Sequence, residues 1–355
     1  MMNDTEINDI RLISDFKSIT FSDYKKTSVI KELLNSLVNS KLENACNWAS
    51  ELICSGHFSD LWETILKFIG KNIHLGNPKL PIYIELRFNN FKSILMSGYL
   101  DNELAMRNNE KIRKIFAEII CVLCKSRKQH SFEPIKIKTQ DEFDITIMSN
   151  KLKADNVKYV EESFLKDDPK ELFIAFNEFA YNISKKSKNT IEACYWIEWI
   201  LEFENICKKK KDSCSCERRQ FAPVNEKFQM DVIWIIWDIL FKESNKINNP
   251  LCSKIMTSLL NIFSIKYKPT IKKRRRYLLY FAVALITENV DYNIEMISDK
   301  KEIDALISKI NVVYKEIKKN EKKPATDYLF NGVEKSNLDK TVQKLDIMKK
   351  IQMGV

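Results

Sequence analysis

Apolar residues recur with helical spacing along most of the chain, starting near Ser28. Residues 1–27 are predicted to form a polar lead-in. The pattern then predicts successive helices over residues 42–53, 59–69, 82–96 and 102–125. Two more helices are expected near the C-terminus, at 303–319 and 338–351. Sparse Gly and Pro residues agree with long helices and short connections. The predicted fold class is all-α.

One stretch is central to this interpretation. Between Ile191 and Ile206 the residues are apolar on nearly every side, which predicts a helix buried inside a bundle. The next segment, KKKKDSCSCERR at 208–219, is strongly basic and is not expected to enter a core. Its lysines suit a helix C-terminus, where they meet the negative end of the helix dipole. We therefore expect a central buried helix that ends in a basic, cysteine-bearing loop.

The order of several core residues recurs along the chain. The motif Ala-Cys-x-Trp ends at Trp48 and again at Trp196. Trp62 precedes an Asn-Pro pair at the same distance as Trp234 does. These matches predict a tandem duplication of a helical unit, at 28–127 and 171–289, stacked as a collar-like or HEAT-like bundle. The alternative is chance similarity, because Trp, Phe and Ile are common in helical cores.

The two predicted repeats are joined by a linker of different character, at 128–170. Its segments KIKT and FDITIM alternate in polarity, which predicts a small hairpin or an extended crossover. Residues 290–355 are expected to add C-terminal helices after the second repeat.

Composition limits the partners and the cellular compartments that we expect for this chain. The 355 residues include 58 basic and 48 acidic side chains, for a formal net charge of +10. This balance is compatible with a polyanionic partner. The N-terminus has no apolar signal segment, and the longest apolar run, Leu278–Ile286, is too short for a bilayer. With nine cysteines, the chain is expected to keep reduced thiols in the cytoplasm or nucleus, not to be secreted and not to bind membranes.

Two basic segments are candidate nucleic-acid contacts. KPTIKKRRR, at 268–276, precedes a predicted buried helix, and a helix N-terminus already attracts anions. We expect this segment and the basic loop to form one exposed surface that binds RNA or DNA phosphates. The predicted contacts are Lys208, Lys209, Lys210, Lys211, Arg218, Arg219, Lys272, Lys273, Arg274, Arg275 and Arg276. Changing the three arginines at 274–276 to alanine is expected to weaken binding without destabilising the fold. A solvated charge run or a nuclear-localisation patch is the alternative.

The cysteines allow a weaker hypothesis. Cys207, Cys214 and Cys216 could bind zinc as thiolates, and the basic neighbours are expected to lower their pKa. Their spacing is not that of paired C-x2-C knuckles, so a basic loop that happens to carry cysteines is favoured and no cofactor is expected. Cys121 and Cys124 lie in an apolar run and are predicted core residues.

Glu198 and Glu202 are spaced to share one helix face, and paired carboxylates can do acid–base or metal chemistry. More often such a pair faces basic side chains. We see no third ligand or base, no Gly-rich phosphate loop and no zinc-protease motif. The sequence therefore favours a protein that is not an enzyme.

Residues 44–84 resemble the helical collar of RarA-type ATPases, relatives of the clamp loaders. The matching positions are Ala45, Trp48, Gly56, Ile73, Leu75, Gly76, Asn77 and Pro78. Lys71 and Asn72 replace the acidic pair of that family, and no ATPase module is present. The resemblance implies only an oligomerisation or docking role. The whole Asn/Ile/Lys-rich chain also looks like uncharacterised proteins of nucleocytoplasmic large DNA viruses, which implies a viral factory and transfers no site residue.

Three functions remain open at this point. The first is a non-enzymatic adaptor that docks a protein partner and contacts nucleic-acid phosphates in viral replication or gene expression. The second is a translation scaffold resembling the HEAT-type middle domain of initiation factor 4G. The third is a metal- or thiol-dependent enzyme that uses Glu198, Glu202 and the cysteine loop.

Overall fold

The computed structural model describes residues 5–100, 102–138, 143, 148–297 and 300–322. In these ranges the chain is helical and forms no sheet, with two isolated bridges, Ile19–Lys25 and Ser215–Asp231. The predicted all-α class is confirmed. None of the described helices combines the length and the apolar character that crossing a bilayer requires.

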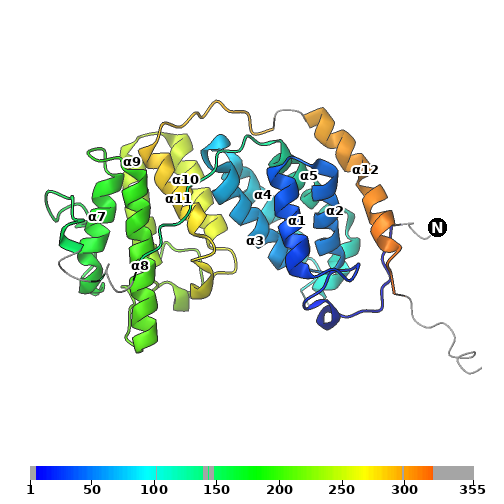
Figure 1. The fold of residues 1–355 in the computed structure, drawn as a ribbon, viewed down its shortest axis with the longest axis horizontal. Coiled ribbons are helices and arrows are strands. Elements are labelled where there is room, and N and C mark those ends of the chain that lie inside the picture. The colour runs from blue at the N-terminus through cyan, green and yellow to red at the C-terminus, as the bar shows by residue number, and fades with distance from the viewer. Residues whose placement is uncertain (1–4, 101, 139–142, 144–147, 298–299, 323–355) are drawn as a thin grey trace, which may run out of the picture.

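Two groups of helices lie side by side in an elongated molecule (Figure 1). The first group contains α1 (Lys26–Val38), α2 (Leu42–Cys54), α3 (Phe58–Phe68), α4 (Leu80–Met96) and α5 (Glu110–Lys125). The second contains α7 (Phe173–Ile183), α8 (Thr190–Lys210), α9 (Ile233–Lys246), α10 (Pro250–Phe263) and α11 (Arg276–Thr287). The last described helix is α12 (Lys300–Lys318).

Asparagine caps set the start of three of these helices. The side chains of Asn109, Asn189 and Asn249 accept hydrogen bonds from backbone N–H groups in the first turns of α5, α8 and α10. Each cap satisfies a donor that the helix itself leaves unpaired. Pro250 follows the third cap at the first helical position, where its missing N–H costs nothing.

The helix order of the two groups corresponds. The contacts α1–α2, α2–α5 and α4–α5 have counterparts in α7–α8, α8–α11 and α10–α11. The rings of Trp62 and Phe91 are 5.7 Å apart, and those of Trp234 and Phe263 are 6.0 Å apart. These similarities agree with a duplication, which stays a prediction.

The two tryptophans that first suggested the repeat differ in their surroundings. Trp48, on α2, is half-buried and meets the ring of Tyr24 edge-on. Trp196, on α8, is fully buried between Tyr195 and Trp199. They lie on corresponding helices but fill different roles in the core.

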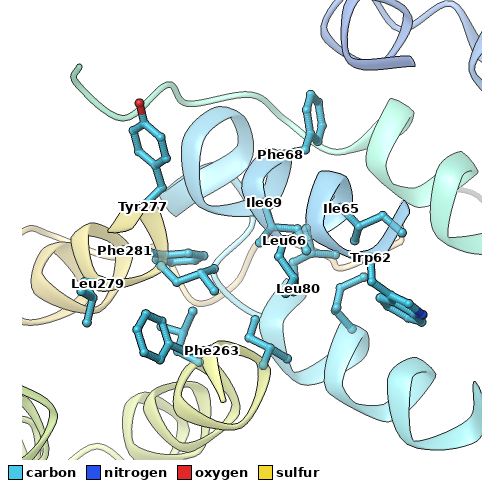
Figure 2. Close-up of a cluster of buried hydrophobic side chains, with 14 of the residues drawn as sticks. Trp62, Ile65, Leu66, Phe68, Ile69, Leu80, Phe263, Tyr277, Leu279 and Phe281 are labelled. Atoms are coloured by element: carbon cyan, nitrogen blue, oxygen red, sulfur yellow. The ribbon is translucent and has the colours of Figure 1, made fainter. Parts of the chain in front are cut away.

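The groups meet along one apolar seam, drawn in Figure 2. Leu66, Ile69 and Leu80 of the first group lie in the centre of this view, with Tyr277, Phe281 and Phe263 of the second group on one side and Trp62 on the other. A short π-helical turn, Ile69–Ile73, continues α3 and packs on α11. A Cβ at Gly70 would lie only 2.8 Å from the carbonyl carbon of Tyr277, so this close approach requires glycine.

Both ends of the described chain are built into the first group. The predicted polar lead-in is wrong in this respect, because Ile7, Phe16 and Phe21 are buried. A long connection carries the chain from α11 across the molecule to α12, which packs on α2 and α5 (Figure 1). Tyr314 of α12 is fully buried there, under the guanidinium of Arg113. The helix predicted at 338–351 lies outside the described residues.

The linker between the groups contains no strand among its described residues. Gln129 and Ser131 donate backbone hydrogen bonds to the carbonyls of Asn72 and Lys71, which hold the extended chain against the seam. Most of the alternating segment FDITIM, at 143–148, lies outside the described residues, so the hairpin remains untested there.

His74 makes the seam sensitive to pH. It is 5% exposed, its ring lies 5.0 Å from that of Phe281, and burial lowers its pKa from 6.5 to about 4. The folded protein resists protonation of this ring. The stability it contributes is therefore complete above pH 6.5 and is lost as pH falls toward 4.

We expect wild type to lose about 3 kcal/mol more unfolding free energy than His74→Asn between pH 7 and pH 4. Asparagine keeps a polar side chain at this position and does not titrate. Urea unfolding at several pH values measures the difference, with the exposed His130→Asn variant as control. Parallel curves for wild type and His74→Asn would contradict the assignment.

Candidate functional site

The basic segment Lys272–Arg276 lies against carboxylates from three other parts of the fold. Lys272 pairs with Glu204 and, at 2.7 Å, with Asp231. The other pairs are Lys273–Glu202 at 2.9 Å, Arg275–Glu63, and Arg276–Glu198 at 3.0 Å. Among the five cations, Arg274 alone is exposed and has no ion pair with a described residue.

This arrangement corrects the expectation that the segment stays outside the core. Lys272 is 4% exposed and Arg275 is 3% exposed. A buried cation needs a partner because removing it from water is costly. The carboxylates also offset the unfavourable placement of positive charge at the N-terminus of α11. Four of the five predicted phosphate contacts in this segment are therefore already neutralised inside the protein.

Arg275 connects the two helix groups. Its Nη1 donates to the backbone carbonyls of Phe263 and Ile265, at 2.5 and 2.7 Å, at the end of α10. Its Nε and Nη2 donate to the carboxylate of Glu63 on α3. The cation thus meets the negative end of one helix and an acidic side chain of another, and both interactions are favourable.

The carboxylate pair on α8 faces basic partners, as the sequence favoured. Glu198 is buried, accepts a 2.6 Å hydrogen bond from the Tyr280 hydroxyl and pairs with Arg276. Burial raises the pKa of Glu198, against the opposing effects of Tyr280 and Arg276. Partial burial also acts to raise the pKa of Glu202, but the hydrogen bonds from Lys273 and Asn205, together with nearby positive charge, outweigh burial and lower that pKa.

An open pocket of about 610 Å³ lies over this pair. It is lined by Glu198, Glu202, Lys273, Arg276 and the linker residues from Glu133 to Ile137. Glu133 is held in place by Lys71 and by the Tyr277 hydroxyl, which donates at 3.2 Å. The two carboxylates of α8 form ion pairs with Lys273 and Arg276, and these ion pairs connect α8 to the start of α11.

The three candidate zinc ligands do not converge. The thiols of Cys207 and Cys214 are hydrogen-bonded to each other, whereas Cys216 is 1% exposed and donates to the Asp231 carbonyl at 3.3 Å. Within the part of the chain that the structure describes, no three His, Cys, Asp or Glu side chains are placed to hold a metal ion. Cys121 and Cys124 are core residues, as predicted.

The thiol pKa values also differ from the expectation. Burial raises the pKa of Cys214 and of Cys216 to about 12 and also raises that of Cys207. Lys272 and Arg219 act in the opposite direction on Cys214 and Cys216, but burial outweighs them. These thiols are protonated at neutral pH, which disfavours nucleophilic attack.

The basic loop divides into an exposed and a buried part. Lys208, Lys209 and Lys210 form the exposed last turn of α8, and Lys211 follows with φ 64°. Figure 1 shows this end of α8 projecting beyond the neighbouring helices. None of the four forms an ion pair with a described residue.

The arginines of the loop are engaged within the protein. Arg219 is 4% exposed and pairs with Asp168 at 2.5 Å, so the expectation that the loop stays outside the core is wrong at this residue. Arg218 is exposed and pairs with Glu226 at 3.1 Å. Lys272 of the other basic segment pairs with Glu204 of α8, one turn before Lys208, and the continuous basic surface stays a prediction.

Sequence reasoning missed a second feature, an apolar cleft between α3, α4 and the loop after α10. Helix α4 offered a signal for it. Its apolar residues cover more than the one face that a surface helix needs for packing, with Leu86, Phe88, Leu95 and Met96 in excess.

Arg275 and its neighbour Arg274 make a matched pair for a stability test. Removing Arg275 leaves Glu63 and two carbonyls without their donor, so Arg275→Ala is expected to lower the unfolding free energy by about 3 kcal/mol or more. Arg274→Ala should change it by less than about 0.5 kcal/mol. Urea unfolding measures both, and equal midpoints would contradict the buried placement. The triple alanine variant is accordingly expected to be destabilised, contrary to the sequence-based expectation.

Comparison of the chain with protein-family models, with curated proteins and with solved structures finds no match. The resemblances to a clamp-loader-like collar and to proteins of large DNA viruses therefore stay predictions. The function has to be inferred from the geometry of the chain itself.

Proposed function

We propose that the protein is a non-enzymatic helical adaptor that binds nucleic-acid phosphates through the projecting end of α8 and docks a protein partner. The observation that carries the proposal is the run of exposed lysines Lys208–Lys211 without ion pairs among the described residues. Lysine side chains on a projecting helix end can follow a phosphate backbone without reading its sequence. Arg274, the exposed cation of the second basic segment, is a further candidate for phosphate contact.

The proposal separates the cations that are paired inside the fold from those that are exposed to solvent. The arginines and lysines that pair inside the fold fix the arrangement of the helices, and the exposed cations without ion pairs among the described residues are left for a polyanion. At the pocket over Glu198 and Glu202 no observation favours a reaction, because Lys273 and Arg276 already engage both carboxylates. The proposed setting, replication or gene expression of a large DNA virus in the cytoplasm or nucleus, rests on the sequence resemblance.

A variant with Lys208, Lys209, Lys210 and Lys211 changed to alanine is the direct test. Binding of a fluorescein-labelled DNA duplex and of a single-stranded RNA is measured by anisotropy at several salt concentrations. For wild type we expect log K to fall linearly with log salt. For the variant we expect the slope to flatten by about one unit for each phosphate that the removed lysines had neutralised.

The matched control removes the same charge elsewhere. Lys31, Lys111, Lys185 and Lys254 are exposed and scattered over four helices or turns, and their change to alanine should leave the slope near that of wild type. Equal reductions of the slope in both quadruple variants would assign binding to net charge alone. Absence of binding by wild type near physiological salt would contradict the proposal. Affinity capture from infected or expressing cells then separates replication from translation, through clamp and polymerase components or helicase and cap-binding factors.

A further inference from the structure

A cleft of about 750 Å³ lies between α3, α4 and the loop that joins α10 to α11. Its floor is aromatic and aliphatic: Phe58, Trp62 and Phe91 are buried, and Phe88, Leu95 and Ile265 are half-buried. The rings of Trp62 and Phe88 are 5.1 Å apart and meet edge-on, so the floor is a packed surface. The volume is in the range of sites that bind other molecules.

The apolar surface continues out of the cleft. Met96 and Leu100 line its end and are 61% and 63% exposed. Large apolar side chains that adjoin a cleft in this way are typical of an interaction site for another macromolecule. Methionine suits this role because its flexible side chain adapts to different partners.

At the rim of the cleft the carboxylates have partners within the protein, whereas two of the lysines have none among the described residues. Glu63 is held by Arg275, Glu103 lies 3.8 Å from Lys266, and Glu85 accepts a 2.6 Å hydrogen bond from Asn261. The rim cations Lys92 and Lys268 are exposed and form no ion pair with any residue that the structure describes. The rim therefore offers unpaired positive charge, which a partner with carboxylates would complement.

The backbone around the cleft limits the form of the partner. The walls are helices α3, α4 and α10, whose backbone groups are bonded within each helix, together with the loop after α10, and the described chain has no sheet edge. A partner segment cannot add as a strand here, so it has to satisfy its own backbone hydrogen bonds. A helix does so and can present apolar side chains along one face.

We propose that the cleft binds an amphipathic helix of a partner protein. Its apolar side chains, spaced i, i+3 or i+4 and i+7, fill the floor over Trp62 and Phe88, and flanking Asp or Glu residues face Lys92 and Lys268. The inference rests on the proposed adaptor function and gives its protein partner a site and a chemistry.

A phage-displayed library of helical peptides, panned against the full chain, provides the probe. Enriched peptides are expected to combine apolar residues at helical spacing with flanking carboxylates. Met96→Glu, Leu100→Glu and the double change of Lys92 and Lys268 to Glu should each weaken their binding at least about tenfold. Leu86→Glu is the matched control, because Leu86 is 56% exposed on the same helix and does not line the cleft. Lys31→Glu is the control for charge.

Several results would overturn the proposal. One is a library from which no peptide is enriched, and another is enriched peptides that bind the cleft variants as they bind wild type. A dimer in sedimentation that Leu100→Glu dissociates would assign the cleft to a second copy of the chain. Displacement of the peptides by a fluorescent fatty acid would assign it to a small amphiphile. Nucleic-acid binding through Lys208–Lys211 should be unchanged in the cleft variants, so failure of this inference is distinguishable from failure of the adaptor function.

Discussion

Positive charge at the start of α11 has to be neutralised before that helix can be buried, and this constraint organises the centre of the molecule. The carboxylates come from α3, from α8 and from the turn before α9. Each ion pair therefore fixes the position of one element relative to α11. A buried cation is costly without its partner, so these pairs specify one arrangement of the helices more than they add net stability.

The apolar seam supplies the burial that the ion pairs orient. Gly70 lets the turn after α3 approach the backbone of Tyr277, and His74 packs on Phe281 beside it. On the far side of the first group, α12 covers α2 and α5 after a long crossing. The two helix groups are thus joined both by direct packing and by a chain that leaves the second group to complete the first.

The proposed function depends on which basic side chains are buried in ion pairs and which are exposed to solvent. Lys272 and Arg275 are used for the fold, whereas Lys208–Lys211 are left in solvent on a projecting helix end. The apolar cleft shows the same division for hydrophobic residues. Helix α4 has more apolar surface than its packing against α10 and α5 covers, and Phe88, Leu95 and Met96 from this excess line the cleft. Charge left unpaired and apolar surface left uncovered are the features that a binding protein can use.

The sequence by itself determined the helical class, the position of most helices and the core placement of Cys121 and Cys124, because helical periodicity is a local property. It also indicated that Glu198 and Glu202 face basic side chains. Which basic side chains they face, and that the facing segment is buried, was decided by tertiary structure.

The reason is that solvation depends on partners distant in sequence. Arg275 and Arg274 are adjacent and chemically identical, yet one is buried against Glu63, 212 residues away, and the other is exposed. The thiols of Cys214 and Cys216 lie among lysines and arginines in sequence, but burial sets their pKa. A run of charged residues fixes what must be neutralised or solvated, and only the packing of the whole chain decides which of the two occurs at each residue.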